Sequence, residues 1–443
     1  MDTYFPATIV AYLELFRQHF PAQHFAYFRG YVWALAMLGP TRKCMTNIAR
    51  TCVFVERHLA SWERFLAESQ WDLRGVSQTL VSHLIQQLGP SVYLWDALLA
   101  AVDTTLIPKV RGQMPGVQKW HDHSGDPARG ESLVGHHWAL IGLVSVWGAG
   151  YLCWPLLARL LPGQLNPLGF VAGAEGVQRL DFWAVVVALV RELPQYVGNR
   201  PLRVVADAYF SKASFLNPLL AAGITVISRL RKDAVGWDDP APVVGKRPRG
   251  RPRKKGQAWK LATLPGVEAV TALVVTIYGK EERLRVVWRD MWLRDVTCQV
   301  RVVVIATEHV PILLVSTDLT LPPAVIIQLY AARFPMELSL RDLKQYCGLG
   351  DYQCYPLLAI HRFVHLAVTA FCLWRLTLLQ DQQAPWLGAE RMNSTRPLTP
   401  LSFQRLHRAL RRLVLQRIFA AFAPGADFQK TEGSYEQIFR ITA

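Results

Sequence analysis

The chain has 443 residues, of which 51% are hydrophobic, so it is long and apolar enough for two or three domains with buried cores, and a disordered protein is excluded. Its formal net charge of +16 favours a polyanionic partner, with nucleic acid ahead of an anionic membrane. Seven cysteines without a paired framework, and a beginning without a basic leader before an apolar run, lead us to expect a reducing cytoplasm rather than secretion.

Residues 1–90 are predicted to be helical, because apolar residues recur at helical spacing in TIVAYLELFRQHF and in SQTLVSHLIQQL. Between these runs, basic and small residues lead into a further helical pattern. A helix-turn-helix-like DNA-binding unit and a plain helical bundle both fit this stretch. We expect an N-terminal DNA-binding region here, without assigning any side chain to base contacts.

Residues 91–230 change to alternating strands and helices and are predicted to be the first part of an α/β core, in the order β-β-β-α-β-α-β. Asp103 lies on the first of these strands and Asp207 at the end of the fourth. Residues 133–158 lack Asp, Glu, Lys and Arg and are long enough to span a bilayer. The Gly-Ala-Gly break at 148–150 favours two buried strands joined by a tight turn, so we expect no membrane association.

Residues 231–323 interrupt this alternation and are predicted to be a β-rich insertion, with two strand pairs after a stretch rich in Pro, Gly and charge. Its basic loop, 246–256, contains PRGRP, which matches the core of an AT-hook. In that motif an extended Arg-Gly-Arg lies in the narrow minor groove of A·T-rich DNA. A loop that binds phosphates without sequence preference is the alternative. The candidate DNA-binding residues of the loop are Arg249, Gly250, Arg251, Lys254 and Lys255.

The core is expected to resume at residues 324–355, and residues 356–443 are expected to form a helical C-terminal region. A single helix over residues 330–344 would place a phenol, two cations and a carboxylate on one face: Tyr330, Arg333, Lys344 and Glu337. Such a face suits a phosphodiester held around a metal ion, whereas a solvated face with weak ion pairs is the simpler explanation. Pro335 leaves the geometry open, because it either kinks this helix or lies in the first turn of a new one.

Three carboxylates are predicted to converge. In a ribonuclease H-like fold the first and fourth strands are neighbours at the centre of the sheet, so Asp103 and Asp207 would meet, and the helix after the insertion would bring Glu337 over them. Hard oxygen ligands of this kind suit Mg²⁺ or Mn²⁺.

At these residues the sequence resembles the DDE transposases of bacterial insertion sequences, and within them the branch whose signature is Y-(2)-R-(3)-E-(6)-K. The sequences DTT around Asp103 and ADAYFSK around Asp207 are similar to that family too, as is the β-rich insertion. The resemblance covers roughly residues 92–350. It implies a ribonuclease H-like α/β catalytic core with a β-rich insertion, between helical N-terminal and C-terminal regions.

The resemblance also implies roles for named side chains. Two Mg²⁺ or Mn²⁺ ions would be bound by the three carboxylates, namely Asp103, Asp207 and Glu337. The phosphates of the transposon end would be held by Tyr330, Arg333 and Lys344, and transposases of this branch commonly pass through a DNA hairpin. The family further stacks a flipped base on an aromatic residue of the insertion. The candidates are Trp288 and Trp292, with cross-strand packing as the alternative for both.

We therefore expect a metal-dependent DNA transposase that cleaves double-stranded DNA at transposon ends and joins the freed 3′-hydroxyl to target DNA. By the resemblance it would work as a homodimer on DNA, in the bacterial cytoplasm at the nucleoid. Two alternatives share the fold: a DNA-binding protein without catalytic activity, and a nuclease that cuts without joining.

Overall fold

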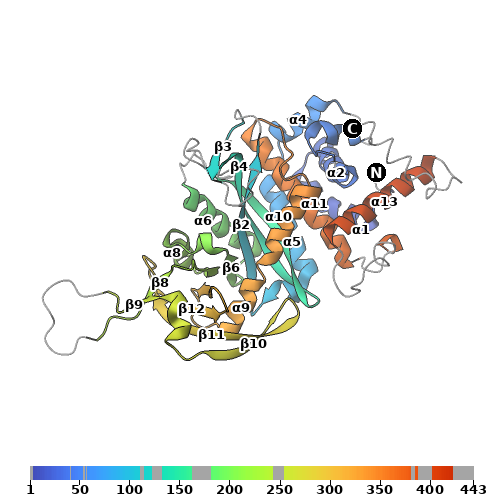
Figure 1. Ribbon diagram of the computed structural model, residues 1–443. Helices are drawn as coiled ribbons and strands as arrows, with labels where there is room; N and C mark the ends of the chain where they lie inside the picture. Colours follow the sequence, from blue (N-terminus) through green and yellow to red (C-terminus); the bar gives the residue numbers. More distant parts are fainter. Residues whose placement is uncertain are drawn as a thin grey trace.

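Apolar strands at the centre of the protein form a sheet, and helices cover both faces of this sheet (Figure 1). The computed structural model describes residues 3–422, except for 40, 53–54, 56, 110–113, 122–131, 162–180, 243–253, 381–384 and 388–401. The described strands join in one mixed sheet, in the order β3-β4-β2-β6-β7-β13-β12-β11-β8-β9, with β1 beside β2, β5 beside β4 and β10 beside β11.

The part of this sheet formed by residues 91–230 runs β5-β4-β2-β6-β7. Its strands are β2 (Ala97–Pro108), β4 (Ser132–Trp147), β5 (Gly150–Leu160), β6 (Leu202–Ala206) and β7 (Thr225–Arg229), with the short β1 (Tyr93–Leu94) and β3 (Gln118–His121) beside them. The β2, β4 and β5 strands are antiparallel, whereas β2, β6 and β7 are parallel. The first and fourth predicted strands, β2 and β6, are therefore direct neighbours, as expected.

The charge-free segment 133–158 forms most of the β4–β5 hairpin, which turns at Gly148 with a φ of 55°. The prediction of two buried strands is thus confirmed, and their apolar sequence follows from burial on both faces. The described helix that is long and apolar enough to cross a membrane is α11 (Leu357–Gln380), but 89% of its apolar window is buried within the protein. Packing inside the fold accounts for that composition.

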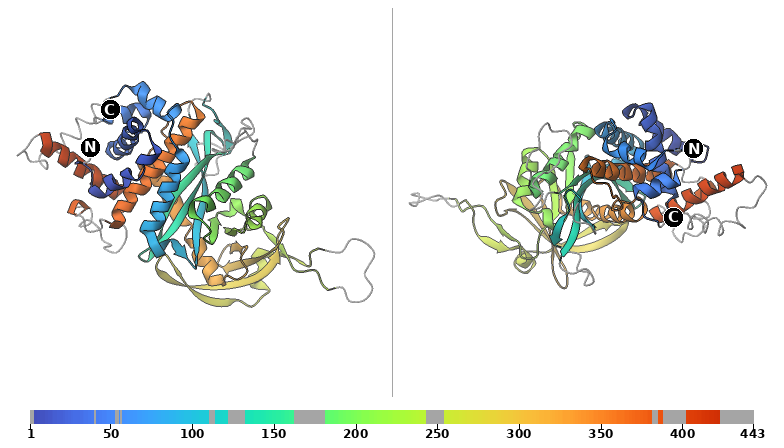
Figure 2. Two further views of the ribbon diagram at one scale, coloured as in Figure 1. Left: turned by 180° about the vertical axis from the view of Figure 1, so that it is seen from behind. Right: turned by 90° about the horizontal axis from the view of Figure 1, so that it is seen from above.

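Two groups of helices enclose the core strands (Figure 2). On one face lie α6 (Phe182–Glu192), the short α7 (Pro194–Val197) and α8 (Ala213–Ala221). On the other face α11 packs on β5 together with α5 (Leu73–Leu88) and α10 (Phe334–Tyr346). Around α11 are gathered α1 (Ala7–Glu14), α2 (Ala22–Met37), α3 (Met45–Thr51), α4 (Leu59–Ala67) and α13 (Phe403–Phe422). The described parts of the N-terminal and C-terminal regions are helical and share one helical layer.

The insertion continues the core sheet. Its strands are β8 (Val235–Trp237), β9 (Ala258–Lys260), β10 (Thr271–Ile277), β11 (Lys280–Trp292), β12 (Gln299–Ala306) and β13 (Ile312–Ser316). Both predicted strand pairs are present as the β10–β11 and β12–β13 hairpins. Because β13 pairs antiparallel with β7, the far end of the insertion is attached directly to the core.

The chain between residues 323 and 346 forms two helices rather than one. Helix α9 (Pro323–Ala331) ends before Arg333, and α10 begins at Phe334 with Pro335 in its first turn. A proline is tolerated there because the first N–H groups of a helix have no intrahelical acceptor. The single continuous helix is therefore wrong, and the alternative, in which Pro335 starts a new helix, is confirmed.

Candidate active site

Asp103 and Asp207 lie at the same height on neighbouring strands. The parallel register of β2 and β6 pairs Val102 with Ala206, and each aspartate is the next residue along the chain. The carboxyl ends of parallel strands are a common place for ligand sites in α/β proteins. The sheet therefore brings together the first two predicted carboxylates.

The backbone around Asp207 is fixed from two sides. On one side, the Ser228 hydroxyl of β7 donates a hydrogen bond of 2.6 Å to the Asp207 carbonyl oxygen. On the other, the Asp207 carboxylate caps the 3₁₀ turn η3 (Ala208–Phe210), accepting from the Tyr209 N–H at 2.9 Å. The Asp103 carboxylate accepts a similar bond of 2.7 Å from the Thr104 N–H. Both carboxylates are thus oriented by backbone donors beside them.

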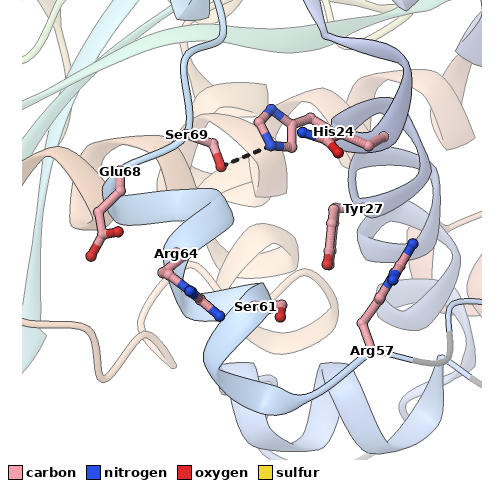
Figure 3. Close-up of a pocket in the computed structure, with 8 residues that line it drawn as sticks. His24, Tyr27, Arg57, Ser61, Arg64, Glu68 and Ser69 are labelled. Carbon is pink, nitrogen blue, oxygen red and sulfur yellow. Dashed lines mark hydrogen bonds between the residues drawn. The ribbon is translucent and has the colours of Figure 1, made fainter.

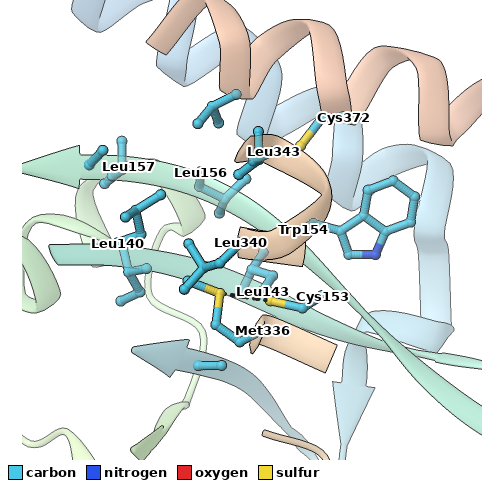
Figure 4. Packing of buried hydrophobic residues seen from close by; sticks show 14 of the residues in the cluster. Leu140, Leu143, Cys153, Trp154, Leu156, Leu157, Met336, Leu340, Leu343 and Cys372 are labelled. Carbon is cyan, nitrogen blue, oxygen red and sulfur yellow. Dashed lines mark hydrogen bonds between the residues drawn. The ribbon is translucent and has the colours of Figure 1, made fainter. Parts of the chain in front are cut away.

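Glu337 lies in the first turn of α10, whose opposite face is packed tightly on the hairpin β4–β5 (Figure 4). Met336, Leu340 and Leu343 of this face are buried. The Ser339 hydroxyl adds a hydrogen bond of 2.9 Å to the carbonyl oxygen of Cys153 on β5. With these contacts below it, α10 also packs against β2 and leaves Glu337 exposed.

A buried ion pair also holds α10. Arg375 of α11 donates to the Cys153 carbonyl oxygen at 2.7 Å and to the Ser339 hydroxyl at 3.0 Å. Its Nη2 atom lies 3.6 Å from a carboxylate oxygen of Asp342 on α10. The side chains of Arg375 and Asp342 are only 9% and 10% exposed. Asp342 also pairs with the exposed Arg341 at 3.2 Å, whereas Asp342 is the carboxylate that pairs with the buried guanidinium of Arg375.

Arg333 links the carboxylates. Its guanidinium lies 3.5 Å from Asp103 Oδ2 and also pairs with the carboxylate of Glu337. It lies 5.9 Å from the centre of the Tyr330 ring, on the last turn of α9. Lys344 lies near the other end of α10, exposed, with its Nζ atom 3.4 Å from the Leu106 carbonyl oxygen of β2. The break between α9 and α10 does not separate the predicted residues. Arg333 lies at this break and contacts the carboxylates of Asp103 and Glu337.

The surroundings of Asp103 and Asp207 disfavour the charged form of each carboxyl group. Burial raises the pKa of Asp103 to about 7; the guanidinium of Arg333 opposes this shift, and the negative charge of Asp207 adds to it. Burial likewise raises the pKa of Asp207, against the hydrogen bond from Tyr209 and the charge of Arg333. Additional positive charge would therefore be favourable here, and a divalent cation would supply it.

The donor set fits a hard divalent ion, since it offers carboxylate oxygens from three chain segments. Within the described part of the chain, no three His, Cys, Asp or Glu side chains are already gathered as a metal site. Arg333 gives a physical reason, because its guanidinium occupies the space between Asp103 and Glu337. Rotation of the Arg333 side chain would free both carboxylates for a shared ion.

A family model described as DDE superfamily endonuclease matches residues 15–295, which is more than half of the chain and includes Asp103 and Asp207. The chain belongs to the DDE superfamily endonucleases. Membership implies a divalent metal ion and a DNA substrate. The matched segment of this DDE endonuclease ends before Glu337. The assignment of Glu337 as the third carboxylate therefore depends on its position in the structure. No curated protein sequence matches the chain significantly.

The structure describes only part of the predicted basic loop of the DDE endonuclease. Arg249, Gly250 and Arg251 lie outside the described residues, and Lys254 is exposed. Lys255 is half-buried, donates a hydrogen bond of 2.7 Å to the Leu293 carbonyl oxygen and lies 4.4 Å from the centre of the Trp237 ring. The ammonium of Lys255 thus anchors the base of the loop, and a DNA contact by Lys255 stays a prediction.

The two candidate stacking residues take part in strand pairing. Trp292 lies opposite Trp237 of β8, and its indole N–H donates to Asp239 at 2.8 Å, as cross-strand packing predicts. Trp288 is 39% exposed and lies opposite Val303 on β12. Base stacking by either residue stays a prediction. The insertion also brings Tyr278, at the tip of the β10–β11 hairpin, close to the site.

Tyr278 is an active-site neighbour that sequence reasoning missed. Its hydroxyl donates to the Ala331 carbonyl oxygen at 3.2 Å, and its ring makes an edge contact with Phe334. Burial raises the pKa of the Tyr278 phenol, the charge of Arg333 opposes this shift and that of Glu337 adds to it, so the hairpin tip is close to both. The turn sequence after an alternating strand predicted the tip of the hairpin. No local pattern predicted which part of the fold this tip contacts.

Arg229 was missed as well. It is exposed at the end of β7. Burial raises the pKa of the Tyr330 phenol, and the positive charges of Arg333 and Arg229 oppose this shift. The site therefore has a second cation close to Tyr330.

The N-terminal helices contain a separate polar cavity of about 420 Å³ between α2 and α4 (Figure 3). Arg57, Arg64 and Glu68 line it, and His24 pairs with the Ser69 hydroxyl at 3.2 Å. Two arginines suit a phosphate group, but DNA binding by the N-terminal region stays a prediction.

Proposed function

We propose that this DDE endonuclease is the transposase of a bacterial insertion sequence, of the branch with the Y-(2)-R-(3)-E-(6)-K signature. The observation that carries the proposal is the contact of Arg333 with both Asp103 and Glu337. It joins the signature residues, which lie outside the matched family segment, to Asp103 inside it. A solvated helix face would have no reason to reach the sheet carboxylates.

In the proposed reaction, Asp103, Asp207 and Glu337 would hold two Mg²⁺ or Mn²⁺ ions. When bound, these ions supply Lewis acidity to the scissile phosphodiester and activate a water or a 3′-hydroxyl for in-line attack. Arg333 would turn from the carboxylates to the DNA phosphates, joined there by Tyr330 and Lys344. The α10 packing described above keeps Glu337 in place during this exchange.

The products would be a cleaved transposon end and a 3′-end joined to target DNA, with a hairpin on the transposon end as the intermediate. We further propose a homodimer in the DNA complex, because two ends must be processed together, and action at the nucleoid in the cytoplasm. The basic loop 246–256 would add a DNA contact, with Arg249, Gly250 and Arg251 as the candidate minor-groove readers.

The DNA that flanks the gene supplies the substrate for the test, since matching inverted repeats there define the ends. Purified protein with these end duplexes and Mg²⁺ is expected to give nicked ends, hairpins and strand-transfer products. Asp103→Ala, Asp207→Ala and Glu337→Ala are each expected to abolish all three. Parent-like cleavage by any of these variants would remove that residue from the catalytic set.

Two results would point to the alternatives. DNA binding without any Mg²⁺-dependent or Mn²⁺-dependent nicking would identify a binding protein that keeps the fold alone. Cleavage without joined products, in the presence of target DNA, would identify a nuclease that does not transpose its product.

A further inference from the structure

A second aromatic cluster lies on the Asp207 side of the site. Tyr209 follows Asp207 by two residues, and its backbone N–H is hydrogen-bonded to the Asp207 carboxylate at 2.9 Å. Tyr209 is nevertheless 41% exposed, although it lies beside the half-buried Asp207. The catalytic carboxylate itself therefore fixes where this phenol emerges.

The Tyr209 ring is supported from behind. It stacks on Trp183 of α6, with 5.2 Å between ring centres and 29° between planes. Phe182 meets it edge-on at 5.5 Å and 90°. Beneath them, Phe210 is buried and in edge contact with Trp183. These contacts hold the ring in one orientation, so little side-chain freedom remains to be lost on binding.

A cation completes the cluster. The Nζ atom of Lys212, at the start of α8, lies 5.0 Å from the Tyr209 ring centre and 5.3 Å from that of Trp183. Lys212 also lines an open cavity of about 530 Å³ that contains Arg231, Arg294 and Trp237, together with two acidic residues, Asp233 and Asp295. This cavity leads from the aromatic cluster toward Lys255 and the base of the basic loop.

We propose that Tyr209, backed by Trp183 and flanked by Lys212, is a stacking platform for an unpaired nucleobase next to the scissile phosphate. A preorganised ring with an adjacent cation is the combination that proteins use to hold single-stranded nucleic acid, because every base has a stacking face and every linkage a phosphate. The proposal rests on the proposed function, since it needs DNA at the carboxylates. It makes Tyr209 a substrate-positioning residue rather than a metal ligand.

The test compares the binding of two probes in Ca²⁺ and without Mg²⁺ or Mn²⁺: a blunt duplex, and the same duplex with a single-stranded tail carrying 2-aminopurine at the first unpaired position. The parent is expected to prefer the tailed probe by about fivefold to a hundredfold, the range of one base–aromatic stack. Binding should quench the 2-aminopurine fluorescence. Tyr209→Ala should lose the preference and the quenching, and Tyr209→Phe should keep both.

Tyr355→Ala is the matched control, because it removes another exposed phenol, 48% exposed, from a different surface. It should behave as the parent does. If the parent binds both probes equally, or if Tyr209→Ala keeps the preference at an unchanged melting temperature, the platform is wrong while DNA binding stands. If the parent binds neither these probes nor the end duplexes, the proposed function itself fails.

Discussion

The Nη1 atom of Arg333 lies 3.5 Å from Oδ2 of Asp103, and the same guanidinium pairs with Glu337. Asp103 comes from the central strand and Glu337 from a helix more than two hundred residues later, so one side chain connects the two halves of the site. A guanidinium offsets the repulsion between such carboxylates in a partly buried position. Metal ions would compete with Arg333 for the two carboxylates, and DNA phosphates would compete with the carboxylates for Arg333.

Asp103 is expected to make the folded protein less stable as the pH rises. Its pKa of about 7 lies above the value of about 3.9 for an unfolded chain, so between these pH values the unfolded state binds fewer protons and stability falls. Asp103→Asn removes this titration. In EDTA the variant should be more stable than the parent by roughly 1–3 kcal/mol at pH 8, and the difference should vanish near pH 4.

Urea unfolding at both pH values measures this difference, and Asp318→Asn provides a control of opposite sign. Burial raises the pKa of Asp318, but hydrogen bonds from Thr320 and the charge of Arg203 lower it overall. Its stabilising effect is therefore present at neutral pH and lost in acid, so Asp318→Asn should lower stability at pH 8. A constant gain for Asp103→Asn at all pH values would contradict the assigned titration.

Divalent metal is expected to stabilise the protein in the absence of DNA. An ion that binds only the folded state contributes about 2.7 kcal/mol at a concentration one hundred times its Kd. Mn²⁺ should therefore raise the melting temperature of the parent, and more at pH 8 than at pH 6, because binding must displace the proton of Asp103. Asp207→Asn and Glu337→Gln should remove most of this increase. Asp290→Asn, whose carboxylate pairs with Arg301 on the insertion, should retain it.

The convergence of Asp103 and Asp207 could be predicted in two steps. Local patterns gave the order of strands and helices in the core, and the ribonuclease H-like fold inferred from it places the first and fourth strands, β2 and β6, side by side. The helix break was visible as well, since Pro335 allowed only a kink or a new start. The sequence did not decide between a kink and a new helix. The structure shows a new helix, α10, which packs on β5.

The remaining features depend on contacts between distant segments, which periodicity does not encode. Tyr278 reaches the site only because the β10–β11 hairpin lies against the β4–β5 turn. Lys255 looked like one more cation of a basic run, yet Trp237 and the Leu293 carbonyl, both distant in sequence, hold its ammonium. Tyr209 lies in the sequence ADAYFSK around Asp207, but its exposure beside the half-buried Asp207 is a property of the fold.

Gly279 is expected to be needed for the contact that carries Tyr278 to the site. Its φ is 75°, and an added Cβ would lie 2.6 Å from the Cβ of Ala149 in the β4–β5 turn. Gly279→Ala should therefore cost about 1–3 kcal/mol of backbone strain and also push the hairpin tip away, lowering the rate of end cleavage. Gly223→Ala is the matched control, since Gly223 has a φ of 72° with nothing within 4 Å. Equal effects of the two substitutions on stability and cleavage would show that the Ala149 contact is unimportant.

The buried pair of Arg375 and Asp342 is expected to decide whether α10 stays in place under Glu337. Asp342→Ala leaves the guanidinium of Arg375 buried without its counter-charge, which typically costs about 3–5 kcal/mol. The double variant Arg375→Met, Asp342→Leu removes both charges and should recover most of that stability in urea unfolding. End cleavage should follow stability in the single variant, because Glu337 shares the helix with Asp342. A double variant as unstable as the single one would instead assign the stabilisation to the bonds from Arg375 to Ser339 and Cys153.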